Sequence, residues 1–196
     1  MRIGLIGGTF DPVHLGHLIG AETARCELEL DKVFFVPAAN PPHKLKAPVT
    51  EAAHRIEMLR RAIAGNECFG LCLDEIERGG SSYTIDTLRR FRKGLKPQDE
   101  LFFILGADNL CEFDTWKEWQ EICRESRIAV LAREGYVHAG SIGIDKPGGM
   151  EIIKVRMPLV DISATGIRSD FAAGRSIRYR VPVPVAEYIE AHGLYS

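Results

Sequence analysis

The chain has 196 residues, of which 45% are hydrophobic and 27% are charged, and its formal net charge is −2. These proportions are ordinary for a soluble globular protein and predict one domain over residues 1–196, with a core over about 1–155 and a C-terminal segment over about 156–196. The nearly balanced charge excludes the broad basic field that attracts nucleic acid, so we expect no nucleic-acid partner. Any anionic ligand must be bound by local groups.

The cysteines and the hydropathy pattern favour a cytoplasmic protein. The five cysteines form no CxxC pair and no zinc-type spacing, which predicts free thiols in a reducing compartment, although Cys68 and Cys72 leave a metal pair as an alternative. The sequence contains neither a secretory segment nor an apolar run of ~18 residues. We therefore expect no membrane partner.

The elements predicted along the chain alternate between apolar strands and amphipathic helices. Strands are expected at 2–6, 32–38, 68–74, 100–106, 127–133 and 150–155. Helices are expected at 15 to about 30, 50–64, 83–94, within 116–125, 165–173 and 185–192, with Thr50 as the N-cap of the second. The strands lack polar alternation, so both of their faces should be buried. The pattern predicts an α/β fold with a doubly wound parallel sheet.

Polar clusters follow the predicted strands, where such sheets bind ligands. The clusters, in chain order, are GGTFDPVHLGH at 7–17, NPPHK at 40–44, SYT at 82–84, GADNL at 106–110, Arg133, and DISATGIR at 161–168. Because parallel strands end at the same edge of a sheet, we expect these clusters to converge there. The sequence therefore predicts one ligand site built from six loops.

The first cluster predicts an anion site at the start of a helix. Its glycines fit neither the dinucleotide fingerprint GxGxxG nor the P-loop, and Gly7 and Gly8 are expected to allow close backbone approach and positive φ. The Asp11-Pro12 pair predicts a turn, after which a helix begins near His14. Free N–H groups and the positive end of the helix dipole favour an anion at that position.

The two histidines of this cluster, His14 and His17, should lie on one helix face because they are three residues apart. Gly16 between them leaves room for a bulky ligand. Two imidazoles at a helix start are suitable donors to phosphate oxygens. Two alternatives remain: metal ligation, for which the sequence supplies no third ligand, and a pair of surface histidines in a helix cap.

Two motifs carry a family resemblance. GGTFDPVHLGH resembles the HxGH signature of the nucleotidylyltransferase superfamily, and ISATGIR at 162–168 resembles its second signature, ISxTxIR, with Ala164 where Ser is frequent. NPPHK, SYTIDTL, GADNL with Trp116, and the C-terminal VPVPVAEYIEAHGLY further resemble bacterial nicotinate mononucleotide adenylyltransferases, from residue 2 to about 194. The resemblance implies a Rossmann-like nucleotidylyltransferase fold.

The implied reaction joins ATP and nicotinate mononucleotide into nicotinate adenine dinucleotide, with release of pyrophosphate, as a step of NAD biosynthesis. A phosphate monoester is already a nucleophile near neutral pH, so catalysis needs alignment and charge neutralisation rather than a strong base. A Mg²⁺ held mainly by the ATP phosphates and water is expected. Another enzyme of the superfamily, such as a pantetheine-phosphate adenylyltransferase or a cytidylyltransferase, and a nucleotide sensor without catalysis remain alternatives. A homo-oligomer is left open.

The resemblance also implies roles for individual residues. The implied catalytic residues are His14, His17 and Arg168. The implied ATP contacts are Gly7, Gly8, Thr9, Phe10, His14, His17, Gly106, Asp108, Ile162, Ser163 and Arg168. The implied contacts to nicotinate mononucleotide are Asn40, His43, Lys44, Tyr83, Thr84, Trp116 and Arg133. No metal-binding residue is predicted.

Within that set, three residues have structural alternatives. Trp116 is predicted to stack on the pyridine ring and Trp119 to lie in the core, with a core position for Trp116 as the alternative. His43 and Arg133 are also compatible with plain surface positions. Outside the set, Asp74 and Glu75 are interpreted as surface acids. Ser163 is expected to start a helix and direct its N–H groups to the same ligand.

Overall fold

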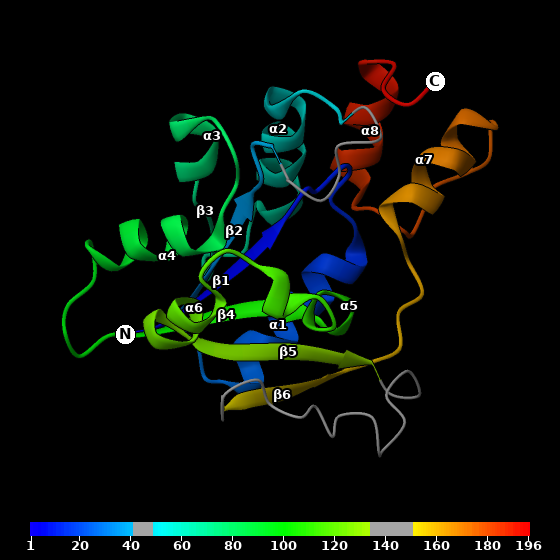
Figure 1. The fold of residues 1–196 in the computed structure, drawn as a ribbon. Coiled ribbons are helices and arrows are strands. Elements are labelled where there is room, and N and C mark those ends of the chain that lie inside the picture. Colours follow the sequence, from blue (N-terminus) through cyan, green and yellow to red (C-terminus); the bar gives the residue numbers. More distant parts are fainter. Residues whose placement is uncertain (41–48, 134–150) are drawn as a thin grey trace.

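The protein folds around a six-stranded sheet in which every strand pair is parallel (Figure 1). The computed structural model describes residues 1–40, 49–133 and 151–196. The strand order is β3-β2-β1-β4-β5-β6. The strands are β1 (Arg2–Gly8), β2 (Lys32–Pro37), β3 (Phe69–Leu71), β4 (Glu100–Gly106), β5 (Arg127–Arg133) and β6 (Ile152–Met157).

Helices cover both faces of this sheet, which confirms the predicted doubly wound α/β fold. One hydrophobic cluster joins the sheet to α1 (Leu15–Glu27), α2 (Ala52–Ile63), α7 (Ala164–Ala172) and α8 (Val183–Ala191). A second cluster joins the opposite face to α4 (Thr84–Arg92), the 3-10 helix η2 (Phe113–Thr115) and α6 (Trp119–Glu125). Two short helices, α3 (Asp74–Arg78) and α5 (Ala107–Leu110), follow β3 and β4.

The continuous apolar character of the strands has a simple physical cause. In β4, Phe102 and Ile104 point into the first cluster, whereas Leu101, Phe103 and Leu105 point into the second. Successive side chains of a strand alternate between the two faces, so a strand covered on both sides must be apolar at every position. The sequence prediction of two-sided burial is therefore confirmed at the centre of the sheet.

Several predicted boundaries are wrong for identifiable reasons. β3 has only three residues, because the chain after Leu71 turns into α3 instead of continuing the strand to residue 74. α1 ends at Glu27. α2 is preceded by Glu51 rather than capped by Thr50, whose backbone N–H donates to Asp11 Oδ2 at 3.1 Å. Thr50 thus belongs to the loop that precedes the helix.

The strand order places the carboxyl end of β1 at the centre of the site edge. β1 lies between β2 and β4, where the order of connection reverses, and ligands bind at such switch points. In Figure 1 the arrows of β1 and β5 point toward the side of the molecule on which α7 lies. The C-terminal helices therefore lie near the strand ends that carry the polar loops.

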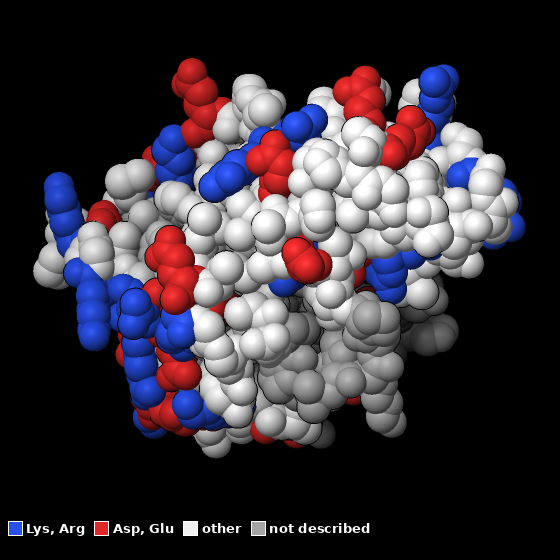
Figure 2. All heavy atoms as spheres, turned by 90° about the horizontal axis from the view of Figure 1, so that it is seen from above, with Lys and Arg blue, Asp and Glu red and all other residues white. Residues whose placement is uncertain are grey.

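The surface carries no single-sign field on the face seen from above. Figure 2 shows basic and acidic side chains interspersed on that face. This distribution agrees with the net charge of −2 and with an anion site made of local groups. No helix among the described residues is long and apolar enough to cross a membrane.

Candidate active site

The loop after β1 is shaped by a buried phenylalanine. β1 continues through Gly8, which pairs with Pro37, so neither Gly7 nor Gly8 adopts the positive φ that we expected. Phe10 adopts it instead, with φ of 52°, and is 2% exposed. A Cβ on Gly8 would lie 2.9 Å from the Phe10 ring, so Gly8 is needed for close approach. Strand pairing holds the glycines extended, and the turn follows at Asp11 and Pro12, as predicted.

The two histidines lie together at the start of α1. His14 is the N-cap residue, and its backbone N–H donates to His17 Nδ1 at 3.2 Å. The two rings stack with centroids 3.6 Å apart, and Phe10 packs edge-on against His17. Since Nδ1 of His17 accepts a hydrogen bond, a neutral ring carries its proton on Nε2. A Cβ on Gly16 would lie 3.1 Å from His14 Nδ1, so the glycine leaves room for the stacked His14 ring.

The C-terminal signature docks directly onto this loop. Arg168 Nη1 donates to the backbone oxygen of Asp11 at 2.6 Å, across 157 residues of sequence. Ser163 caps α7, as expected, with its Oγ accepting from the Gly166 N–H at 3.1 Å. Ile162 packs against the first hydrophobic cluster. Neither α1 nor α7 has an acidic residue in its first turn, so no first-turn carboxylate offsets the positive end of either helix.

A buried arginine that sequence reasoning missed supports the same loop. Arg55 is 2% exposed and donates to the backbone oxygens of Thr9, Ala38 and Thr50 at 2.8, 2.9 and 2.8 Å. Burial lowers the pKa of Arg55, against the raising effect of the nearby Asp11 charge. The sequence does hold a signal for this role: Arg55 lies three residues before the buried Met58 and so falls on the apolar face of α2.

The end of β4 brings the predicted adenosine contacts to the same edge. Gly106 is the last strand residue and precedes α5, in which Asp108 is exposed. β4 pairs directly with β1, so the two loops emerge from neighbouring strands. Arg133 ends β5, the next strand outward, as the sequence predicted.

Asn40, Tyr83 and Thr84, which are predicted to bind the mononucleotide, lie on the other side of β1. Asn40 Nδ2 donates to the Gly80 oxygen at 3.1 Å, and Ser82 Oγ accepts from the Asn40 N–H at 3.2 Å. These bonds join the loop after β2 to the loop that leads into Tyr83 and Thr84. His43 and Lys44 lie outside the described residues.

The two tryptophans both pack against the second hydrophobic cluster. Trp116 is half-buried, with its ring 5.4 Å from Phe113 and 6.1 Å from Phe103. Trp119 is also half-buried and lies 6.4 Å from Phe113. Lys117 extends over the Tyr83 ring, with Nζ 4.5 Å from the ring centroid. Trp116 therefore lies at the border of this cluster, partly buried against it.

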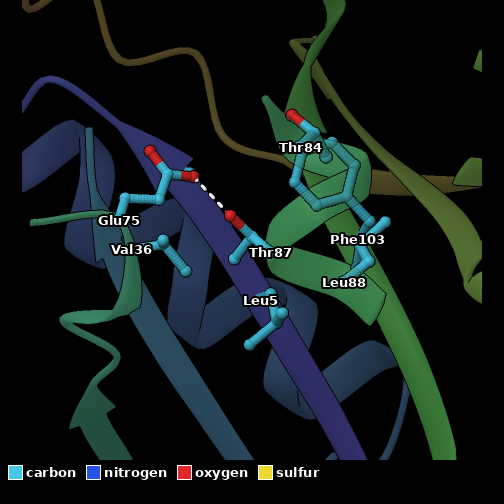
Figure 3. A pocket seen from close by; sticks show the side chains of 8 residues that line it. Leu5, Val36, Glu75, Thr84, Thr87, Leu88 and Phe103 are labelled. Atoms are coloured by element: carbon cyan, nitrogen blue, oxygen red, sulfur yellow. Dashed lines mark hydrogen bonds between the residues drawn. The ribbon is translucent and has the colours of Figure 1, made fainter. Parts of the chain in front are cut away.

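A small cavity of about 20 Å³ lies where β1, β2 and β4 meet α3 and α4 (Figure 3). It is lined by Leu5, Gly7, Val36, Glu75, Thr84, Thr87, Leu88 and Phe103. Glu75 is 8% exposed and accepts a hydrogen bond from Thr87 Oγ1 at 2.8 Å. The interpretation of Glu75 as a surface acid is therefore wrong, because the unpredicted helix α3 turns its side chain inward. Asp74 is also mostly covered and pairs with Arg90.

The donors at this edge suit a phosphate more than a metal. Among the described residues, no group of three histidine, cysteine, aspartate or glutamate side chains is arranged to hold a metal ion. The carboxylate of the first loop, Asp11, already accepts hydrogen bonds from Tyr195 and Thr50. The site also contains imidazole, guanidinium and helix-start N–H groups, which bind anions.

Comparisons with known proteins agree with this geometry. Residues 5–170 match the family model described as cytidylyltransferase-like. A Thermus thermophilus protein named "Probable nicotinate-nucleotide adenylyltransferase" is 47% identical over 195 residues, and an Exiguobacterium sibiricum protein of the same name is 43% identical over 196 residues, each match covering 100% of both chains.

Solved structures share the fold. The Plasmodium falciparum nicotinic acid mononucleotide adenylyltransferase complexed with NaAD superposes with a TM-score of 0.79 at 20% identity, covering 99% of this chain and 97% of that one. The same enzyme complexed with APC gives a TM-score of 0.78. At 20% identity these structures show only that the fold is shared. The family is shown by the sequence relatives and the family model. The chain belongs to the nicotinate-nucleotide adenylyltransferase family, within the cytidylyltransferase-like proteins.

Proposed function

We propose that this protein transfers the adenylyl group of ATP to nicotinate mononucleotide, giving nicotinate adenine dinucleotide and pyrophosphate in NAD biosynthesis. One observation carries the proposal: the bond from Arg168 to the Asp11 carbonyl brings a helix-start histidine pair and a guanidinium to one edge of the sheet. Together they form an electropositive site beside the switch point, where a triphosphate fits. The family membership supplies the acceptor.

The chemistry needs no side-chain nucleophile. An oxygen of the 5′-phosphate of the mononucleotide attacks the α-phosphorus of ATP, a new P–O bond forms, and the bond from the α-phosphorus to the bridging oxygen breaks. The electron pair leaves with pyrophosphate. The monoester attacks in its ionised form, so the protein has to align the two phosphates and neutralise the charge that develops.

On the ATP side, the proposed donors follow from the hydrogen bonds described above. His17 Nδ1 accepts from the His14 N–H, so a neutral ring carries its proton on Nε2, and we assign this N–H to the α-phosphate. Ser163 and Arg168 contact the β- and γ-phosphates, and the N–H groups near Thr9 and Phe10 assist. Gly106, Asp108, Gly7, Gly8 and Ile162 complete the proposed ATP contacts, with Asp108 toward the ribose hydroxyls.

On the mononucleotide side, we assign the pyridine ring to Trp116 and its carboxylate to the start of α4. The Tyr83 N–H already donates to the Ser81 oxygen at 3.1 Å, so the first-turn N–H of Thr84 is the better candidate for the carboxylate. Asn40, in the loop after β2, and Arg133, at the end of β5, are candidates for the mononucleotide phosphate. His43 and Lys44 remain predictions for the same group.

Mg²⁺ enters the proposal with the nucleotide. The donor set of the site is cationic and N–H in character, so its residues do not fit a metal cage, and we assign them no Mg²⁺ ligand. The ion would be held by phosphate oxygens and water, and the alignment described above relies on protein groups alone. A cytoplasmic location, the lack of a nucleic-acid partner and the possibility of a homo-oligomer also stay predictions.

The test is a comparison of acceptors with the purified protein. Pyrophosphate release and dinucleotide formation are measured with ATP and, in parallel, nicotinate mononucleotide, nicotinamide mononucleotide and phosphopantetheine. We expect the highest kcat/KM with nicotinate mononucleotide, because a carboxylate accepts from backbone N–H groups where an amide presents its own N–H. Turnover with phosphopantetheine alone would overturn the proposal. ATP binding without turnover on any acceptor would favour a nucleotide sensor.

A further inference from the structure

Asp11 connects the phosphate site to the C-terminus of the chain. Its backbone oxygen accepts the hydrogen bond from Arg168 Nη1. Its carboxylate, in a residue only 4% exposed, accepts from the Thr50 N–H through Oδ2 at 3.1 Å and from the Tyr195 hydroxyl through Oδ1 at 2.6 Å. One residue of the loop between Phe10 and His14 is therefore held at three atoms. Two of these bonds come from the C-terminal part of the chain.

The tail after α8 is built to deliver this hydroxyl. Gly193 and Tyr195 both adopt positive φ, of 57° and 69°, which reverses the chain after the helix. The Leu194 N–H donates to the Ile189 oxygen at 3.1 Å and fixes the reversal. Positive φ is unfavourable for a tyrosine, so the geometry persists because the surroundings hold it.

The Tyr195 hydroxyl is suited to act as a lasting donor. Burial, followed by the hydrogen bond and the charge of Asp11, raises the pKa of Tyr195 far above its ordinary value. The phenol therefore stays protonated throughout the pH range of an enzyme assay. A hydrogen bond between a hydroxyl and a carboxylate is charge-assisted and strong.

We propose that Tyr195 is a positioning residue for adenylyl transfer: through the Asp11 carboxylate it fixes the loop whose backbone holds Arg168 and carries His14 and His17. The inference rests on the proposed function. Tyr195 itself contacts no phosphate. It acts by removing the freedom of Asp11 to rotate and of the loop to shift, and in-line transfer is sensitive to such shifts, since a displacement of ~1 Å can reduce the rate ~10²-fold.

Two other contacts show why the tyrosine matters at this point. Arg55 holds the loop from one side through the Thr9 oxygen, two residues before Asp11. Thr50 holds the carboxylate through a backbone N–H, which no substitution at that position except proline removes. Tyr195 supplies the remaining bond to the carboxylate among the described residues, and it is the one that a single side-chain change can delete.

The experiment compares Tyr195→Phe with a matched control, Tyr188→Phe. Tyr188 is 7% exposed, lies in α8, and its hydroxyl is 2.9 Å from His54 Nδ1 on α2, so its loss also removes a buried phenol hydrogen bond in the C-terminal segment. We measure kcat, both KM values and the Tm of each variant. Tyr195→Phe should lower kcat ~10-fold with little change in KM for the mononucleotide, whereas Tyr188→Phe should keep kcat. Both should lower Tm to a similar extent.

A wild-type kcat for Tyr195→Phe would overturn the proposal, and so would equal losses of kcat in the two variants, since these would indicate a general packing effect. A double-mutant cycle with Asp11→Ala adds a second criterion: if Tyr195 acts through Asp11, the double variant should be no slower than Asp11→Ala alone. If the losses of kcat in Tyr195→Phe and Asp11→Ala multiply in the double variant, Tyr195 does not act through Asp11. If Asp11→Ala does not fold, the two tyrosine variants still decide.

A binding measurement separates this inference from the proposed function. The affinity for a non-hydrolysable ATP analogue is measured by calorimetry for the wild type and both tyrosine variants, with no acceptor present. Tyr195→Phe should weaken binding several-fold relative to Tyr188→Phe, because Arg168 is less well held. If the wild type fails to use nicotinate mononucleotide but this difference appears, the proposed acceptor is wrong and the positioning role stands. If the wild type turns over nicotinate mononucleotide normally but Tyr195→Phe and Tyr188→Phe show the same affinity for the ATP analogue and the same kcat, the positioning role is wrong.

Discussion

The side of the site proposed for the phosphates, residues 7–17 with 161–168, is held by partly buried polar bonds. The side proposed for the mononucleotide, around Asn40, Tyr83 and Trp116, is held mainly by half-buried aromatic rings. On the phosphate side, one guanidinium and one phenol converge on Asp11 from distant parts of the chain. On the mononucleotide side, Lys117 lies over Tyr83 and pairs with Asp86 at the surface.

This difference follows from the ligands that we propose. A triphosphate carries several charges and has to be aligned for in-line attack, so its donors gain from being fixed before it binds. A pyridine ring is flat and apolar and needs a matching surface, which rings supply through packing. We therefore expect substitutions on the phosphate side to affect kcat and the KM for ATP, and substitutions on the mononucleotide side to affect the KM for the mononucleotide.

The largest expected effect is that of His17→Ala. Loss of the Nε2–H donor should lower kcat by at least ~10²-fold, as for removal of one oxyanion donor, with the fold intact. Steady-state kinetics and circular dichroism check both statements. His192→Ala, which removes an exposed histidine of the C-terminal segment, serves as the control and should keep kcat. A near-wild-type rate for His17→Ala would show that the motif is misassigned.

The next effect is that of Arg168→Lys. The planar guanidinium of arginine can donate to the Asp11 carbonyl and to a phosphate at the same time, whereas the single ammonium of lysine keeps the charge but cannot reach both. The KM for ATP should therefore rise ~10-fold, and kcat should fall. Arg175→Lys is the matched control, because Arg175 is exposed and pairs with Asp170 on the same segment. Equal behaviour of the two variants would contradict the role of Arg168.

A smaller effect is expected for Trp116→Ala. The loss of one stacked ring should raise KM for the mononucleotide ~5-fold and leave KM for ATP nearly unchanged. Trp119→Ala, which removes the other ring that packs near Phe113, should lower the Tm without this selective change. An equal rise in both KM values for Trp116→Ala would exclude stacking.

The smallest effect on activity is expected for Thr87→Val. The substitution removes the hydroxyl that donates to Glu75 and leaves a buried carboxylate with one bond fewer, at a cost of about 1–3 kcal/mol in the free energy of unfolding. Denaturant unfolding measures this loss. Activity at low temperature should change little, because neither side chain is among the proposed substrate contacts, although both line the small cavity; a large fall in kcat at unchanged stability would instead place Glu75 in the chemistry.

The parts of the site that the sequence predicted are those with local signatures. The ends of β4 and β5, the start of α1 at His14 and the Ser163 cap of α7 depend on residues close together in the chain, and the structure confirms them. Glu75, Arg55 and the start of α2 depend on distant partners. The local patterns predicted Glu75 as a surface acid and Thr50 as the cap of α2, and they assigned no role to Arg55.

Sequence alone determined the doubly wound sheet and the convergence of the polar loops, because apolar strands covered on both sides and parallel connections leave few other arrangements. Only the tertiary structure decided that Phe10, rather than Gly7 or Gly8, takes the positive φ, and that Asp11 is held from residues 168 and 195. The reason is physical: strand pairing keeps the glycines extended, and a buried carboxylate takes its donors from whatever segments the fold brings within hydrogen-bond distance.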